Sequence, residues 1–298
     1  MKGIQIRIIQ ILIIVVLFFI AGGLLYGGTG RDTMGNYVSI PDKDIRAVVL
    51  SPGAAEVLFS IGLDEEIVGV SDYCNWPPEK VKAKKKVGGF STPNIEIISV
   101  LKPHVVVLTS VVPYNIKEQL ESLGIKIFVS EPSSFVELID SIVELGKLFN
   151  RKEDAYRIVS YMKDEVGKVQ SLIRTNSLRP VKTMVEIWDN PLYVASPDTL
   201  PADIVRLAGG EIVPSDTSGF VRISEEVVIA LKPEAMVLGH KISVDDFISA
   251  HKNLSIIPAM RNRKIIVPDP DEFLRPGPRV VNALKEIARY LHPEAFSE

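Results

Sequence analysis

Seven side chains follow short apolar segments of the chain and could together contact one large, partly apolar ligand. Six are aromatic and one is an arginine: Tyr73, Trp76, Phe90, Trp188, Tyr193, Phe220 and Arg275. Aromatic rings bury a large area and stack on flat ligand surfaces, whereas a guanidinium pairs with carboxylate groups. Any one of these rings could simply pack in a core or on a surface. As a set placed after predicted strands from two halves of the chain, they favour a binding cleft.

Catalytic groups are not recognisable in the sequence. It contains no GxSxG, HExxH or P-loop motif, and no GxGxxG motif follows a strand. The histidines (His104, His240, His251 and His292) lack the spacing of metal ligands, which favours solvated or helix-capping roles. The single cysteine, Cys74, excludes an intrachain disulfide and is expected to be a small buried side chain. We therefore predict a binding protein that is not an enzyme and carries no metal or cofactor of its own.

A short motif occurs twice, 130 positions apart, as "NIEIISVLKPHVVVL" from Asn94 and "SEEVVIALKPEAMVL" from Ser224. Each copy has a capping residue, a glutamate two positions later (Glu96 and Glu226), and Leu-Lys-Pro before an apolar run. Six of the fourteen positions in 95–108 and 225–238 are identical. Helix caps, first-turn acids and a terminating proline explain part of this likeness. The Lys-Pro match exceeds those general rules and predicts two related lobes.

The elements around these motifs alternate between short β-branched strands and amphipathic helices, which is typical of an α/β fold with mainly parallel sheets. Between the two halves, one continuous apolar stripe predicts a single long helix at 153–174. We expect a linker at 29–45, an N-terminal binding lobe at 46–150, a bridging helix at 151–177 and a C-terminal binding lobe at 178–298.

The N-terminus carries Lys2 and Arg7 before an apolar run from Ile8 to Tyr26. This pattern predicts a signal anchor or transmembrane segment at 1–28, with cleavage near "FIAGG" as the alternative. No cysteine follows the run, which excludes attachment by lipid at that point. The chain of 298 residues has a formal net charge of −3, and its one lysine-rich stretch, "KAKKK", is short, so nucleic acid is not an expected partner.

Four segments resemble the extracytoplasmic solute-binding proteins of iron-chelate and cobalamin importers: "VVLSPGAAEVLFSIGL", "VGVSDYCNWPPE", "VGGFSTPNIEIISVLKPHVVV" and "ISEEVVIALKPEAMVL". The resemblance covers about residues 46–292. It implies a class III periplasmic-binding-protein fold, with two Rossmann-like lobes joined by one rigid helix. It also implies that Glu96 and Glu226 dock onto arginines of a permease dimer, one on each lobe. The chain departs from the family where a spanning segment stands in place of the usual lipid or cleaved signal.

The resemblance further places Tyr73, Phe90, Tyr193, Phe220 and Arg275 at or near the positions that line the cleft in cobalamin-binding relatives. It implies a corrinoid or ferric-chelate ligand, an ABC permease with its ATPase subunits as partners, and a location outside the membrane, anchored by the N-terminal segment or secreted if that is cleaved. Haem and siderophores remain alternative ligands. A membrane-anchored sensor or scaffold with the same fold is the alternative function.

Overall fold

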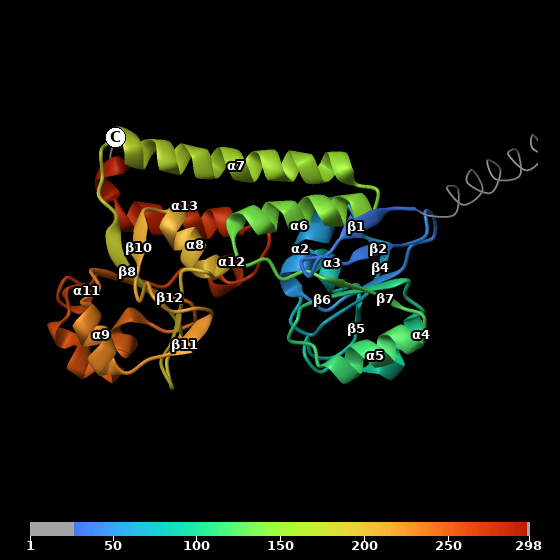
Figure 1. Ribbon diagram of the computed structural model, residues 1–298, viewed down its shortest axis with the longest axis horizontal. Helices are drawn as coiled ribbons and strands as arrows, with labels where there is room; N and C mark the ends of the chain where they lie inside the picture. Colours follow the sequence, from blue (N-terminus) through green and yellow to red (C-terminus); the bar gives the residue numbers. More distant parts are fainter. Residues whose placement is uncertain (1–26, 297–298) are drawn as a thin grey trace, which may run out of the picture. The chain divides into compact units, whose positions relative to one another are not determined.

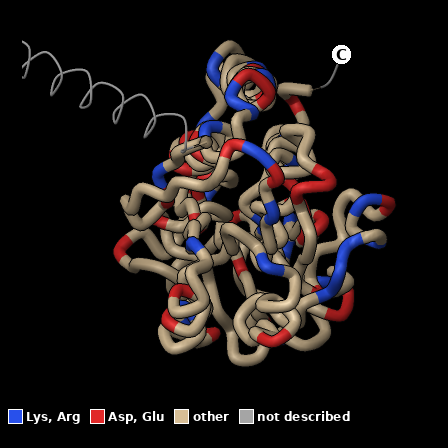
Figure 2. Tube along the Cα trace, turned by 90° about the vertical axis from the view of Figure 1, so that its right-hand side faces the viewer, with Lys and Arg blue, Asp and Glu red and all other residues tan. Residues whose placement is uncertain are grey.

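The computed structural model describes residues 27–296, in which short strands alternate with helices (Figure 1). These residues divide into two compact units. The first unit extends to Ser130 and also includes Ser141–Ala155, and the second unit combines Glu131–Asp140 with the chain from Tyr156 onward. Along the described trace, Lys and Arg are interspersed with Asp and Glu (Figure 2).

The first unit contains a parallel sheet in the strand order β5-β4-β3-β6-β7. Its elements are β3 (Ala47–Val49), α2 (Pro52–Ser60), β4 (Ile67–Val70), α3 (Pro78–Val81), β5 (Lys85–Lys86), α4 (Ile95–Leu101), β6 (Val105–Leu108), α5 (Tyr114–Ser122) and β7 (Lys126–Val129). Helices α4 and α5 lie side by side (Figure 1) and bury Ile98 and Leu120 against Val48 and Val106 of the sheet. All residues of β3 and β6, in the middle of the sheet, are apolar and buried, as expected when helices cover both faces of a parallel sheet.

The segment expected to be a linker, 29–45, is instead folded onto the first unit. Strands β1 (Thr29–Arg31) and β2 (Tyr37–Ser39) form an antiparallel hairpin, in which Val38 and Ile40 are buried. The buried carboxylate of Asp32 accepts hydrogen bonds from the backbone N–H groups of Asn36 and Val129. Glycine and polar residues suggested a flexible tether, but these few apolar side chains and one satisfied acid are enough to fix the segment.

The second unit has a mixed sheet in the order β11-β9-β8-β12-β13, with β10 pairing with β8. Its strands are β8 (Val181–Trp188), β9 (Tyr193–Ala195), β10 (Gly210–Ile212), β11 (Phe220–Arg222), β12 (Ala235–Leu238) and β13 (Ile265–Ile266). Its helices are α8 (Leu200–Leu207), α9 (Glu225–Leu231), α10 (Val244–Ala250), η1 (Lys252–Ile256), α11 (Pro258–Arg261), α12 (Pro270–Phe273), α13 (Val280–Leu291) and η2 (Pro293–Ala295). Strands β9 and β11 pair antiparallel to their neighbours, whereas β10, β12 and β13 pair in parallel.

The repeated motif forms the same structure in both units. Helices α4 and α9 each have seven residues and end at a lysine in the left-handed region, with φ 45° at Lys102 and 49° at Lys232. The following proline disfavours the α conformation for that lysine, so the helix must end there. The buried strands β6 and β12 come next and pair in parallel with β3 and β8. The sequence repeat is therefore a repeat of helix, cap and central strand.

Two long helices follow the first sheet, α6 (Phe135–Leu148) and α7 (Lys152–Thr175). The predicted stripe of α7 is buried at Ala155, Val159, Met162, Val166 and Val169. In the second unit, Glu165 of α7 accepts a hydrogen bond from Lys285 of α13 at 2.7 Å. At 24 residues, α7 extends about 36 Å.

The predicted signal anchor at 1–28 lies almost entirely outside the described residues. Within residues 27–296, no helix is both long enough and apolar enough to span a membrane.

Candidate functional site

Tyr73 and Phe90 meet at the carboxyl edge of the first sheet. Tyr73 follows β4 and Phe90 follows β5, and these two strands are parallel neighbours. The ring centroids are 5.2 Å apart with an angle of 72° between the planes, an edge-to-face contact. Tyr73 is 57% exposed and Trp76, in the same loop, is 43% exposed. This pair leaves an aromatic surface open to a ligand.

Lys86 of β5 holds the loop that carries Tyr73 and Trp76. Its ammonium group donates hydrogen bonds to the backbone oxygens of Ser71 and Cys74, at 3.1 and 2.7 Å. The Cys74 thiol is buried 3.3 Å from the Ser71 hydroxyl. Cys74 is thus the small buried side chain that was predicted, and it helps to fix the aromatic loop.

Trp188, Tyr193 and Phe220 belong to the antiparallel edge of the second sheet. Trp188 ends β8 and is the cross-strand partner of Tyr193 in β9, which in turn faces Arg222 in β11. Directly opposed residues point to the same face of a sheet, and so do residues two apart on one strand. The side chains of Tyr193, Arg222 and Phe220 therefore share one face, and Trp188 pairs with Tyr193 after a register shift in β8. Trp188 is 58% and Phe220 54% exposed.

The prediction that these rings come after strands is wrong for the second unit. Trp188, Tyr193 and Phe220 are strand residues, because the chain after β8 turns back into β9 before any helix begins. The three residues reach the same edge of the sheet by antiparallel extension of its central strand.

A buried acid, Glu186, lies two residues before Trp188 in the chain. Glu186 of β8 is fully buried, and neither of its carboxyl oxygens has an aligned hydrogen bond with another described residue. His240, in the loop after β12, places Nε2 2.9 Å from Glu186 Oε2, and its ring centroid is 6.3 Å from that of Trp188. Burial raises the pKa of Glu186 to about 8, assisted by the charge of Asp189, and burial lowers the pKa of His240. Glu186 is therefore protonated and His240 neutral near pH 7.

Sequence reasoning missed Glu186 and His240 as parts of this edge. The available signal was the glutamate near the end of the predicted strand "VKTMVEIW", since an acid is rarely fully buried unless it is paired. Among residues 27–296, no three His, Cys, Asp or Glu side chains are placed to hold a metal ion.

Arg275 lies after β13, in the loop that follows α12. Its guanidinium forms an ion pair with Asp271 at 2.7 Å, and its side chain is mostly buried. Arg279 is similarly paired with Glu272 at 3.4 Å. Both positive charges are thus largely balanced within the protein.

Glu96 and Glu226 occupy the same exposed position in the first turn of α4 and of α9. The two helix starts differ in their caps. The Asn94 side chain accepts a hydrogen bond from the Ile97 N–H at 2.9 Å, whereas the Ser224 side chain makes no such bond to the backbone of α9. A hydrogen bond from Ser224 instead lowers the pKa of Glu226.

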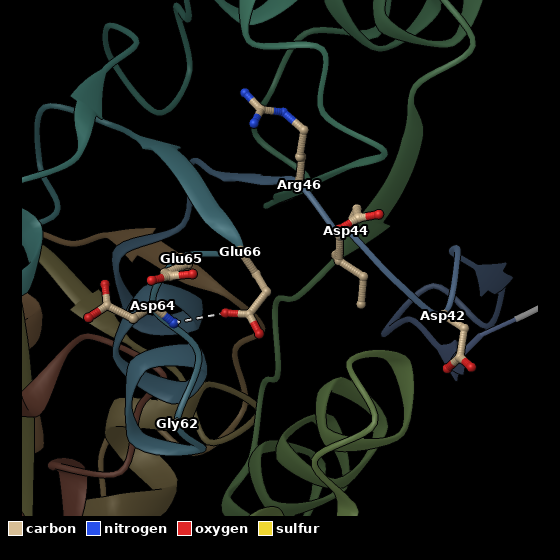
Figure 3. Close-up of a pocket in the computed structure, with 8 residues that line it drawn as sticks. Asp42, Asp44, Arg46, Gly62, Asp64, Glu65 and Glu66 are labelled. Carbon is tan, nitrogen blue, oxygen red and sulfur yellow. Dashed lines mark hydrogen bonds between the residues drawn. The ribbon is translucent and has the colours of Figure 1, made fainter.

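An acidic pocket of about 590 Å³ in the first unit lies at the amino ends of the sheet strands (Figure 3). Its walls come from the segment before β3, with Asp42, Asp44 and Arg46, and from the turn before β4, with Asp64, Glu65 and Glu66. These segments meet at the amino ends of the strands. Ligands of open α/β sheets bind at the carboxyl ends, where the aromatic residues are.

Known proteins match this chain over most of its length. A family model described as "Periplasmic binding protein" matches residues 48–272. An uncharacterized ABC transporter substrate-binding lipoprotein, YvrC of Bacillus subtilis, is 26% identical over 273 residues, covering 90% of this chain and 86% of that protein. A vitamin B12-binding protein of Yersinia pestis is 26% identical over 249 residues, covering 83% and 86%.

Solved structures share the fold. The periplasmic vitamin B12 binding protein BtuF of Vibrio cholerae matches with a TM-score of 0.73 and 22% identity, over 85% of this chain and 98% of that chain. The periplasmic heme-binding protein RhuT from Roseiflexus sp. RS-1 matches with a TM-score of 0.74 and 24% identity, over 84% and 99%.

Proposed function

Because the chain belongs to the periplasmic binding protein family, we propose that it is the extracytoplasmic substrate-binding component of an ABC importer. It binds a corrinoid or an iron chelate such as haem and delivers it to a permease. The reaction that drives transport, ATP hydrolysis, belongs to separate subunits. The observation that carries this proposal is that each unit exposes aromatic rings at one edge of its sheet, Tyr73 with Phe90 and Trp188 with Phe220.

The charges around these rings support a ligand with a broad apolar surface and few negative charges. Arg275 and Arg279 are already paired with acids, which leaves Arg222 as the exposed guanidinium beside Tyr193, and Glu186 and His240 are neutral near pH 7. A highly anionic ferric siderophore would be recognised by several available guanidinium groups. Cobalamin is therefore the first candidate, and haem is the second.

The ligand is expected to change the fluorescence of Trp76 and Trp188 on titration. Full-length protein in detergent would be titrated with cyanocobalamin, haemin and a ferric siderophore, and we expect saturable quenching by cyanocobalamin. Trp188→Ala should weaken binding by about tenfold, because a lost aromatic stacking contact costs ~1 kcal/mol or more. Tyr161→Ala, at an exposed ring of α7, is the matched control and should bind normally. If none of the three compounds binds, the proposed ligand class is wrong.

The long helix α7 should limit the change in shape of the protein on ligand binding. We expect the radius of gyration to change by less than about 1 Å on ligand binding, since an unbroken helix resists a wide hinge motion. Small-angle X-ray scattering of ligand-free and ligand-saturated protein measures this change. A shift of several ångströms would contradict the proposed rigidity of α7.

A further inference from the structure

Three segments of the second unit meet at one buried imidazole. His251 is the residue between α10 and η1, and its side chain is 11% exposed. Its Nε2 lies 2.5 Å from Asp189 Oδ1, in the turn after β8, and its Nδ1 lies 2.7 Å from Glu225 Oε1, at the start of α9. The ring centroids of Phe247 and His251 are 4.6 Å apart. Asn253 donates a hydrogen bond to the other carboxyl oxygen of Glu225 at 2.8 Å.

Both neighbours of His251 are carboxylates, which accept hydrogen bonds but do not donate them when ionised. A neutral imidazole has one N–H, so both contacts are satisfied only by the imidazolium form. Burial disfavours that charge, but the hydrogen bonds to Glu225 and Asp189 outweigh burial and raise the pKa of His251. The same contact is the main cause of the lowered pKa of Glu225. The geometry of the two contacts therefore favours the imidazolium form of His251, a bridge with an acid at each end.

The two ends of this bridge adjoin two residues of the candidate site. Asp189 directly follows Trp188, and Glu225 directly precedes Glu226. The first turn of α9 also lacks the side-chain cap bond that Asn94 gives to α4. In the first copy of the motif, Ile95 stands at the position of Glu225, so that copy has no carboxylate to bridge. The contacts of Glu225 with His251 and Asn253 hold the start of α9 in place of a cap.

We propose that His251 is a positioning residue that couples the turn after Trp188 to the first turn of α9, so that ligand contact at Trp188 alters the presentation of Glu226. The identity of the two coupled surfaces rests on the proposed function. The coupling itself is a property of the second unit and can be measured without a ligand.

Hydrogen exchange of full-length protein tests the coupling. The reporters are the N–H groups of Val227 and Val228, which bond to Ser224 O at 3.1 and 3.2 Å. Asp189→Asn changes the end of the bridge remote from α9, and should still raise exchange at these amides by about fivefold, since it weakens a charged hydrogen bond. His251→Gln should raise it by at least as much. The double variant should exchange no faster than His251→Gln alone, because both act through one bridge.

Two comparisons separate coupling from general damage. The Ile98 N–H, which bonds to Asn94 O in α4, should exchange at the wild-type rate in every variant. His251→Arg should restore slow exchange in α9, because a guanidinium stays charged and donates toward both acids. The proposal is overturned if Asp189→Asn leaves α9 unchanged, or if the effects of the two variants simply add. A failure of cyanocobalamin, haemin and the siderophore to bind would count against the proposed function alone.

Discussion

Reversing the charge of both Glu96 and Glu226 to lysine is expected to lower ligand uptake by whole cells at least about tenfold. Both side chains are exposed in the same turn of a duplicated helix, one in each unit, and a permease dimer would offer two like basic sites to them. Lysine would meet these basic sites with a like charge, which slows association and disfavours the docked state. Uptake of radiolabelled cobalamin by cells that carry the variant measures the effect.

Ligand affinity and folding should stay close to wild type in the same variant, because both side chains are exposed and neither belongs to the set of aromatic residues. Each single reversal should give an intermediate loss. Glu153→Lys is the matched control, since Glu153 is also an exposed first-turn glutamate, in α7, but lies outside the repeated motif. Uptake equal to that of the control would show that the two acids only offset the positive ends of their helices.

The overall α/β fold could be predicted from the sequence because the local signals agreed with one another. The Leu-Lys-Pro stop, the caps at Asn94 and Ser224 and the apolar runs after them marked the same helix and strand in both units. The stripe of α7 was equally clear, and its bounds, Lys152–Thr175, lie within one residue of the expected 153–174. Each of these elements is specified by residues close together in the chain.

The parts that could not be predicted depend on contacts between distant residues. The hairpin at 29–39 is fixed by Val129 and by Glu144, which are about a hundred positions away. Strands β9 and β11 have only three residues each, and they are fixed by pairing, β9 with β8 and β11 with β9. His251 caps the end of α10, which is one of its two predicted roles, but its contacts with Asp189 and Glu225 could not be predicted, because the spacing of these residues reveals nothing until the chain has folded.

Replacing Glu186 with glutamine is expected to stabilise the protein more strongly as the pH rises from 4.5 to about 8. The pKa of Glu186 is about 8 in the folded protein and 4.5 without burial, so over this interval the folded state holds a proton that the unfolded state has lost. In the wild type, the contribution of Glu186 to the free energy of unfolding is therefore fully present below pH 4.5 and is lost as the pH rises toward 8. The unfolding free energies of the two proteins should diverge by roughly 1 kcal/mol per pH unit.

Urea denaturation of both proteins at pH 5, 6, 7 and 8 measures this divergence. Glu211→Gln, at an exposed glutamate of β10 in the same sheet, is the control and should run parallel to the wild type. The opposite result is informative because His240 Nε2 lies only 2.9 Å from Glu186 Oε2. If the pair were ionic, with the proton on His240, glutamine would leave a buried imidazolium without its partner and destabilise the protein at neutral pH. A less stable variant would thus show that Glu186 is charged at neutral pH, and a more stable variant would show that it is neutral.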